Sequence, residues 1–184
     1  VRNAFNEQVI GELSEIFSVL PQDEETRVVV LAGKGKVFSA GADLNWMRSM
    51  VGASEEENYQ DARRLADLLA LIDTCPKITI ARVQGAALGG GMGLASVCDI
   101  VIAEKEAKFG FTEVRLGLIP AIISPFVIKK IGPSWARRSF VTGETFCGEA
   151  ARGVGLVHDL VDAGELDARV EKIAQEALKA SPTA

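Results

Sequence analysis

Apolar residues along this chain follow two spacings, and each spacing predicts one kind of element. Helical spacing predicts amphipathic helices over residues 5–20, 59–72, 133–143 and 166–178. Short runs rich in β-branched residues predict buried strands over residues 28–31, 78–83, 99–103 and 156–158. Because strands alternate with helices, the chain is expected to form a layered α/β fold.

The same spacing predicts which side chains of two helices face the core. On the first helix they are Phe5, Val9, Ile10, Leu13, Ile16, Phe17 and Leu20. On the second they are Tyr59, Ala62, Leu65, Ala66, Leu69 and Ile72. Pro21 ends the first helix, and Ser54 with Glu57 three residues later is typical of a capping box before the second.

Two loops rich in small residues each follow a predicted strand. The first is residues 37–44 (VFSAGADL), and the second is residues 84–99 (QGAALGGGMGLASVCD). Three consecutive glycines cost backbone entropy on folding, so they indicate positive φ or a very close approach of another group. Either loop alone is compatible with a tight connection and nothing more. Together they offer two sets of backbone N–H groups that would stabilise an oxygen gaining negative charge.

A third stretch places one carboxylate among apolar residues. Glu113 lies within residues 109–120 (FGFTEVRLGLIP). Burial would raise the pKa of such a carboxyl and suit it to proton transfer. His158 is the only histidine, and the chain has no GxSxG sequence, so a histidine-dependent triad is not indicated.

The stretches FSAGADL, QGAALGGGMGLASVCDI and FGFTEVRLGLIP resemble, in this order and spacing, the motifs of the enoyl-CoA hydratase/isomerase (crotonase) superfamily. The resemblance implies the crotonase fold, a spiral of ββα repeats, assembled as a homotrimer or a dimer of trimers. It implies one domain over residues 1–184, with the family's first strand and C-terminal trimerisation helices outside this chain. Residues 121–124 are expected to line a pocket for the acyl group.

The resemblance also implies roles for individual residues. The backbone N–H groups of Ala40 and Gly90 would form the oxyanion hole for a thioester carbonyl, and Glu113 would be the catalytic carboxylate. Contacts with the substrate or its coenzyme A are implied for Arg2, Ala40, Gly41, Ala42, Asp43, Leu44, Gly89 and Gly90. For Arg2, a solvated surface charge is an equal alternative. No metal is implied, and no cofactor apart from the coenzyme A of the acyl-CoA substrate.

One position departs from the family pattern. Hydratases of the common type hold their water with two glutamates, and Gly93 stands where the first is expected. The space beside a glycine would admit a bulky acyl group. The finer match of GADLNWMRSM and LGLIPAIISPFV resembles the bacterial methylglutaconyl-CoA hydratase branch. We therefore expect hydration of a 2-enoyl-CoA, with a Δ3,Δ2-enoyl-CoA isomerase and a non-catalytic acyl-CoA-binding protein as alternatives.

Composition narrows the possible partners. The net charge of −5 supplies no basic field for nucleic acid or an anionic membrane surface. The three cysteines are far apart and form no CxxC pair, which argues against a disulfide framework or a zinc site. No apolar run approaches the roughly 20 residues that span a bilayer. We therefore expect a cytoplasmic protein that binds neither nucleic acid nor membrane.

Overall fold

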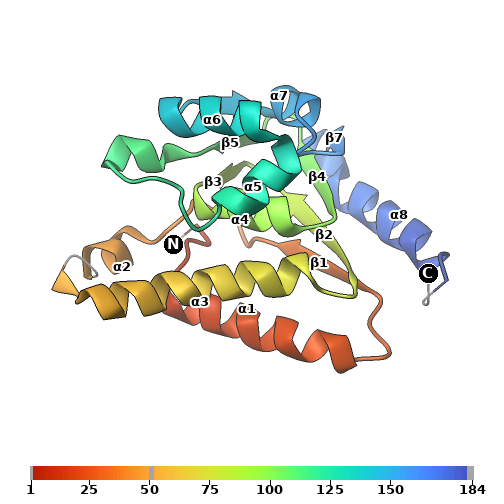
Figure 1. Cartoon of the computed structure of the whole chain (residues 1–184). Coiled ribbons are helices and arrows are strands. Elements are labelled where there is room, and N and C mark those ends of the chain that lie inside the picture. Colours follow the sequence, from red (N-terminus) through yellow and green to blue (C-terminus); the bar gives the residue numbers. More distant parts are fainter. Residues whose placement is uncertain (1, 50–51, 182–184) are drawn as a thin grey trace.

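Four parallel strands form the main sheet of the computed structural model, which describes residues 2–49 and 52–181 (Figure 1). Their order is β1 (Val28–Ala32), β2 (Ile78–Val83), β4 (Ile100–Glu104) and β7 (Asp159–Val161). The register pairs Val30 with Ile80, and Ile80 with Ile100. Parallel strands are usually covered on both faces, which explains why their sequences are continuous apolar runs.

Helices cover both faces of this sheet. On one face, Leu166 and Val170 of α8 (Leu166–Leu178) form a cluster with Ile80 and Ile102. The main core on the other face receives side chains from α1 (Glu7–Val19), α3 (Glu55–Asp73), α4 (Gly90–Val97) and α5 (Ser124–Ile131). Figure 1 shows α1 and α3 side by side along this face.

Three short strands form a second sheet. β3 (Ala86–Leu88) pairs in parallel with β5 (Lys108–Gly110), which pairs antiparallel with β6 (Thr145–Cys147). The sequence pattern missed them because three residues are too few to show an alternation. β3 lies inside the glycine-rich stretch, so this stretch is a short strand followed by a helix rather than one turn. The remaining helices are α2 (Leu44–Ser49), α6 (Pro133–Thr142) and α7 (Gly148–Gly153).

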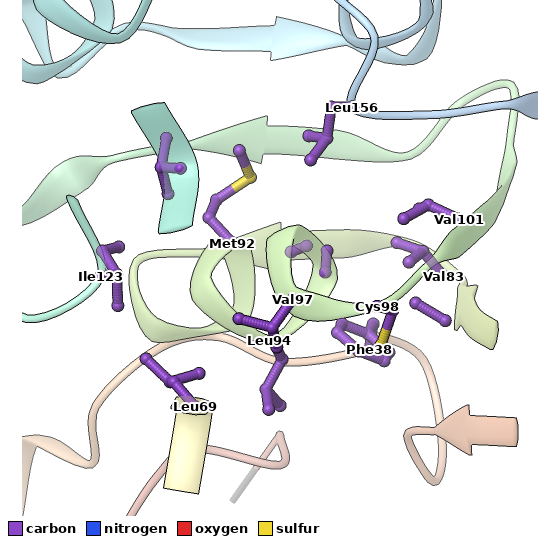
Figure 2. Packing of buried hydrophobic residues seen from close by; sticks show 14 of the residues in the cluster. Phe38, Leu69, Val83, Met92, Leu94, Val97, Cys98, Val101, Ile123 and Leu156 are labelled. Carbon is purple, nitrogen blue, oxygen red and sulfur yellow. The ribbon is translucent and has the colours of Figure 1, made fainter. Parts of the chain in front are cut away.

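Helix α4 is enclosed by the core. Every residue from Gly91 to Val97 is buried. Figure 2 shows Met92, Leu94 and Val97 of this helix among side chains from several other elements, including Leu69 of α3. A helix of eight residues is not stable alone in water, so the surrounding packing holds it and fixes the position of its first turn.

Several predicted details are confirmed and several are wrong. The capping box of Ser54 and Glu57 is present at the start of α3. Ile16 and Tyr59 were expected in the core but are 51% and 56% exposed. Tyr59 lies in the first part of α3, where residues 55–60 all project into solvent. Near the end of α1, Phe17 is buried, whereas the neighbouring Ile16 faces solvent.

The last strand begins three residues later than predicted. Leu156 and Val157 are fully enclosed by the core, whereas pairing with β4 begins at Asp159. The apolar pattern therefore marked burial rather than strand pairing. α5 was also missed, although Pro125 in its first turn is a known start signal for helices.

His158, the residue before β7, is hydrogen-bonded to β4. Val101 N–H donates to His158 Nδ1 at 2.9 Å, and His158 N–H donates to Val101 O at 2.9 Å. Desolvation lowers the pKa of His158, and the charge of Lys130 adds to this effect, while the charge of Asp159 opposes it. An imidazole that accepts through Nδ1 must be neutral at that nitrogen, so its role here is structural.

We therefore predict that stability falls as pH drops below the ordinary histidine value of 6.5. The unfolded chain binds the histidine proton first, because the pKa is lowered in the folded state, so acid favours unfolding. Urea unfolding between about pH 5.5 and 7.5 measures the slope. His158→Asn keeps an acceptor for Val101 and does not titrate, so it should flatten the slope. An equal slope in this variant would assign the effect to other groups.

Candidate active site

The first small-residue loop is held on both of its sides. On one side, Ser39 N–H donates to Ala86 O at 3.1 Å and Leu88 N–H donates to Ser39 O at 3.0 Å. On the other, Phe5 N–H donates to Gly41 O at 2.7 Å. Gly41 has φ of +89°, and a Cβ there would lie 3.1 Å from Leu88 O. Glycine is therefore required at the point where this loop crosses β3.

The second loop meets the first at the start of α4. Gly89 has φ of +50°, and α4 begins at the next residue. A Cβ on Gly91 would lie 2.9 Å from Ser39 Cβ, so only glycine allows this close approach. A Cβ on Gly41 would lie 3.6 Å from the backbone N of Gly90. The structure thus brings together the two loops that the sequence singled out.

The two proposed oxyanion donors differ in whether their N–H groups already make a hydrogen bond. Gly90 N–H opens α4, and no hydrogen bond among residues 2–49 and 52–181 uses it. Ala40 N–H donates to Arg2 O at 3.2 Å. A ligand oxygen at this point would accept from Gly90 directly and would replace Arg2 O at Ala40. The oxyanion hole itself stays a prediction.

Glu113 lies over the second loop, on the 3₁₀ turn Thr112–Leu116. A Cβ on Gly89 would lie 3.1 Å from Glu113 Oε1. Glu113 Oε2 is buried and has no hydrogen-bond partner within the described part of the chain. Desolvation raises the pKa of this carboxyl above 4.5, and a bond from its own backbone opposes the shift only partly. A buried acceptor without a partner is rare and indicates a site that a ligand or water completes.

A cavity of about 630 Å³ lies against Ala40, Gly89 and Glu113, whereas Gly90 is not among the residues that line it. Seven of the residues singled out from the sequence line it: Arg2, Ala40, Gly41, Ala42, Asp43, Gly89 and Glu113. Six further residues do so as well: Ala4, Met47, Arg48, Leu88, Thr112 and Leu116. Leu44 begins α2, but its side chain is outside the described residues. The expected acyl-pocket segment, residues 121–124, is not part of this lining.

Other kinds of site receive no support from the described residues. Among residues 2–49 and 52–181, no three His, Cys, Asp or Glu side chains gather as a metal site would require. Within the same ranges, no helix combines the length and apolar character needed to cross a membrane. Asp99 accepts hydrogen bonds from the backbone N–H and the hydroxyl of Thr79, both at 2.8 Å, which gives it a structural role.

The comparison with known families shows the family of this chain. Residues 1–184 match the family model described as enoyl-CoA hydratase/isomerase. The chain belongs to the enoyl-CoA hydratase/isomerase family. Membership supports an enzyme of the hydro-lyase type.

Solved members of the family share the fold. An enoyl-CoA hydratase from Shewanella pealeana is 42% identical, with a TM-score of 0.94 over 98% of this chain and 68% of that one. AtuE of Pseudomonas aeruginosa is 37% identical, with a TM-score of 0.96 over 99% and 71%. The crotonase fold expected from the sequence is confirmed.

Curated relatives include the enoyl-CoA hydratase AKT6-1 of Alternaria alternata, 37% identical over 180 residues. The match covers 96% of this chain and 56% of that relative, so the chain spans little more than half of its length.

Gly93 is the position at which the resemblance led us to expect a glutamate, and the space beside it is filled. A Cβ on Gly93 would lie 2.6 Å from Ile123 Cγ2 and 3.6 Å from Leu69 Cδ1. Ile123 is itself buried, at 3% exposure. The expectation that this glycine leaves room for an acyl group is therefore wrong. The isoleucine side chain occupies the room that the missing carboxylate would have needed.

We predict that Gly93→Ala destabilises the fold by about 1–3 kcal/mol, because the added methyl overpacks the contact with Ile123. Gly11→Ala on α1 is the matched control: a Cβ there meets nothing within 4 Å. It should stabilise by about 0.5–1 kcal/mol, the usual gain of alanine over glycine within a helix. Urea unfolding measures both changes.

The double variant Gly93→Ala with Ile123→Ala tests the cause. Removing Ile123 Cγ2 should make the alanine at position 93 less costly than it is alone. Equal costs in the two backgrounds would mean that Ile123 is not the residue that closes this space.

Proposed function

We propose that this chain forms the active site of an acyl-CoA hydratase, which adds water to the double bond of a 2-enoyl-CoA. The observation that carries the proposal is the Glu113 carboxyl. Its Oε2 is buried and without a partner among the described residues, and this half-buried residue lines a cavity together with both small-residue loops.

The proposed reaction begins with the thioester carbonyl. Its oxygen accepts hydrogen bonds from the N–H groups of Ala40 and Gly90, which draws electrons from the double bond and makes the β-carbon electrophilic. Glu113 removes a proton from water as the oxygen of that water adds to the β-carbon. The negative charge then rests on the thioester oxygen, and Glu113 returns a proton to the α-carbon. One missing donor in a site of this kind typically costs about 100-fold or more in rate.

Charges at the cavity suit the other end of the substrate. Arg2 and Arg48 both line it, although the net charge of the chain is negative. Arginine binds phosphate groups through several parallel N–H bonds. We propose that these two side chains contact the phosphates of coenzyme A.

The closed space beside Gly93 bears on the choice of substrate. With Ile123 in that space, the carboxylates of Asp43 and Glu113 line the cavity among the described residues, and Asp43 Oδ1 already accepts from Trp46 N–H at 3.2 Å. A carboxylate carried by the substrate would supply a second acceptor for the water. This favours a branched, carboxylated substrate such as 3-methylglutaconyl-CoA, from the breakdown of leucine or isoprenoids. Unbranched substrates of fatty-acid breakdown remain the broader class.

The second candidate is a Δ3,Δ2-enoyl-CoA isomerase, because a single buried carboxylate can move a proton from one carbon to another without water. Absorbance of the conjugated thioester separates the candidates when crotonyl-CoA, 3-methylglutaconyl-CoA and a 3-enoyl-CoA are offered separately. Loss of the band from either 2-enoyl substrate supports hydration. A gain of the band from the 3-enoyl substrate, without any loss, makes the isomerase the better assignment. Binding of all three without change indicates a non-catalytic protein.

We also propose assembly into a homotrimer or a dimer of trimers, in the cytoplasm. An apolar run after Glu113 supports assembly: Leu116, Leu118 and Ile119 are 58%, 45% and 78% exposed. The free thiols of Cys75, Cys98 and Cys147 support a reducing compartment. Sedimentation equilibrium measures the assembly, and a strictly monomeric chain would contradict it.

We predict that Glu113→Gln lowers kcat for hydration by about 100-fold or more, because the amide cannot accept a proton from water. Glu106→Gln, at an exposed turn between β4 and β5, is the matched control and should leave the rate unchanged. In the unaltered protein, kcat/KM should fall as pH drops through the raised pKa of Glu113, since only the ionised carboxylate acts as a base. Hydration that survives in Glu113→Gln would remove Glu113 from the mechanism.

A further inference from the structure

Asn3 connects the chain before α1 to the loop that follows β1. Its side-chain Nδ2 donates to Lys34 O and to Val37 O, both at 2.8 Å. These carbonyls lie 31 and 34 residues away in the sequence. A Cβ on Gly33 would lie 2.6 Å from Asn3 Nδ2, so the amide is packed closely against this loop.

The backbone of Asn3 is also unusual. It has φ of +52°, in the left-handed region that asparagine tolerates better than most residues other than glycine. This conformation turns its carbonyl toward the first small-residue loop, where Ser39 Oγ donates to Asn3 O at 2.9 Å. The same Ser39 Oγ accepts from Gly41 N–H at 3.3 Å.

These bonds enclose Ala40, the proposed oxyanion donor. Ala40 lies between Ser39 and Gly41, and its own N–H points at the carbonyl of Arg2, the neighbour of Asn3. Two further bonds run beside it, from Phe5 N–H to Gly41 O at 2.7 Å and from Asp43 N–H to Phe5 O at 2.8 Å. A ligand oxygen would replace Arg2 O at Ala40, so the bonds that then hold this loop are those of Asn3 O and of the Phe5 backbone. The Asn3 amide anchors the segment that makes them.

We propose that Asn3 is a positioning residue for the oxyanion hole: its amide fixes the loop of Ala40 so that this N–H reaches the thioester oxygen together with Gly90 N–H. The inference rests on the proposed function, since it requires a thioester at these two donors. When a donor is displaced by a fraction of an ångström, the enolate loses more stabilisation than the bound thioester does. The substitution should therefore lower kcat more than it changes KM.

Asn3→Gly tests the inference directly. Glycine accepts positive φ without cost, so this variant keeps the backbone conformation and removes only the amide. Asn6→Ala is the matched control, because it removes another asparagine contact three residues away: Asn6 Oδ1 accepts from Val9 N–H at 2.9 Å and caps α1. Asn3→Asp keeps the size of the side chain and replaces both donors, and it serves if the glycine variant does not fold.

The readout is the absorbance of bound 2,4-hexadienoyl-CoA, which moves to longer wavelength when hydrogen bonds polarise its carbonyl. Asn3→Gly should reduce this shift and lower kcat about tenfold or more, with KM changed less than about threefold. Asn6→Ala should lower the melting temperature and keep the full shift.

Each other outcome overturns the inference. A full shift and unchanged kcat in Asn3→Gly would show that the amide does not set the donor. Equal decreases of the absorbance shift and of kcat in Asn3→Gly and Asn6→Ala would mean that Asn3 only contributes to the stability of the fold. Bound dienoyl-CoA without any shift in the unaltered protein would instead remove the oxyanion hole, and the proposed function would fail together with the inference.

Discussion

The close contact between α4 and the loop of residues 38–43 is the constraint on which the site depends. Gly91 lets the helix approach Ser39 to a distance that any side chain would prevent, and positive φ at Gly89 starts the helix there. Backbone N–H groups are weak donors one at a time and effective when two converge on one oxygen in a site shielded from water. In the proposed mechanism these glycines therefore contribute by fixing the positions of backbone N–H groups, since none of them reacts.

Burial gives Glu113 its chemical character. Neutral apolar surroundings raise the pKa of a carboxyl because the charged form loses hydration, and no cation or hydrogen-bond donor among the described residues reverses this at Oε2. A carboxylate held in this state is a stronger base than one in water.

The sequence predicted the parts of this structure that are encoded locally. Strand runs such as residues 78–83, the capping box at Ser54 and the carboxylate of Glu113 follow from spacing and residue type. The second sheet did not, because each of its strands has only three residues and is held by neighbours distant in sequence. The cavity residue Arg48 also needed the fold, since the sequence around it does not indicate which way its side chain faces.

The Gly93 position shows why a motif alone is an incomplete description of a site. Read from the sequence, a glycine in place of a glutamate removes a functional group and leaves space. In the structure, the side chain of Ile123, 30 residues later in the sequence, fills that space. Position 93 therefore has no carboxylate and is in contact with an apolar side chain. A glutamate restored at Gly93 would meet this wall, and a charge pressed against Ile123 and Leu69 without a partner would be costly. The packing of Ile123 and Leu69 against α4 therefore excludes a glutamate at position 93, and a single substitution would not introduce a second carboxylate there.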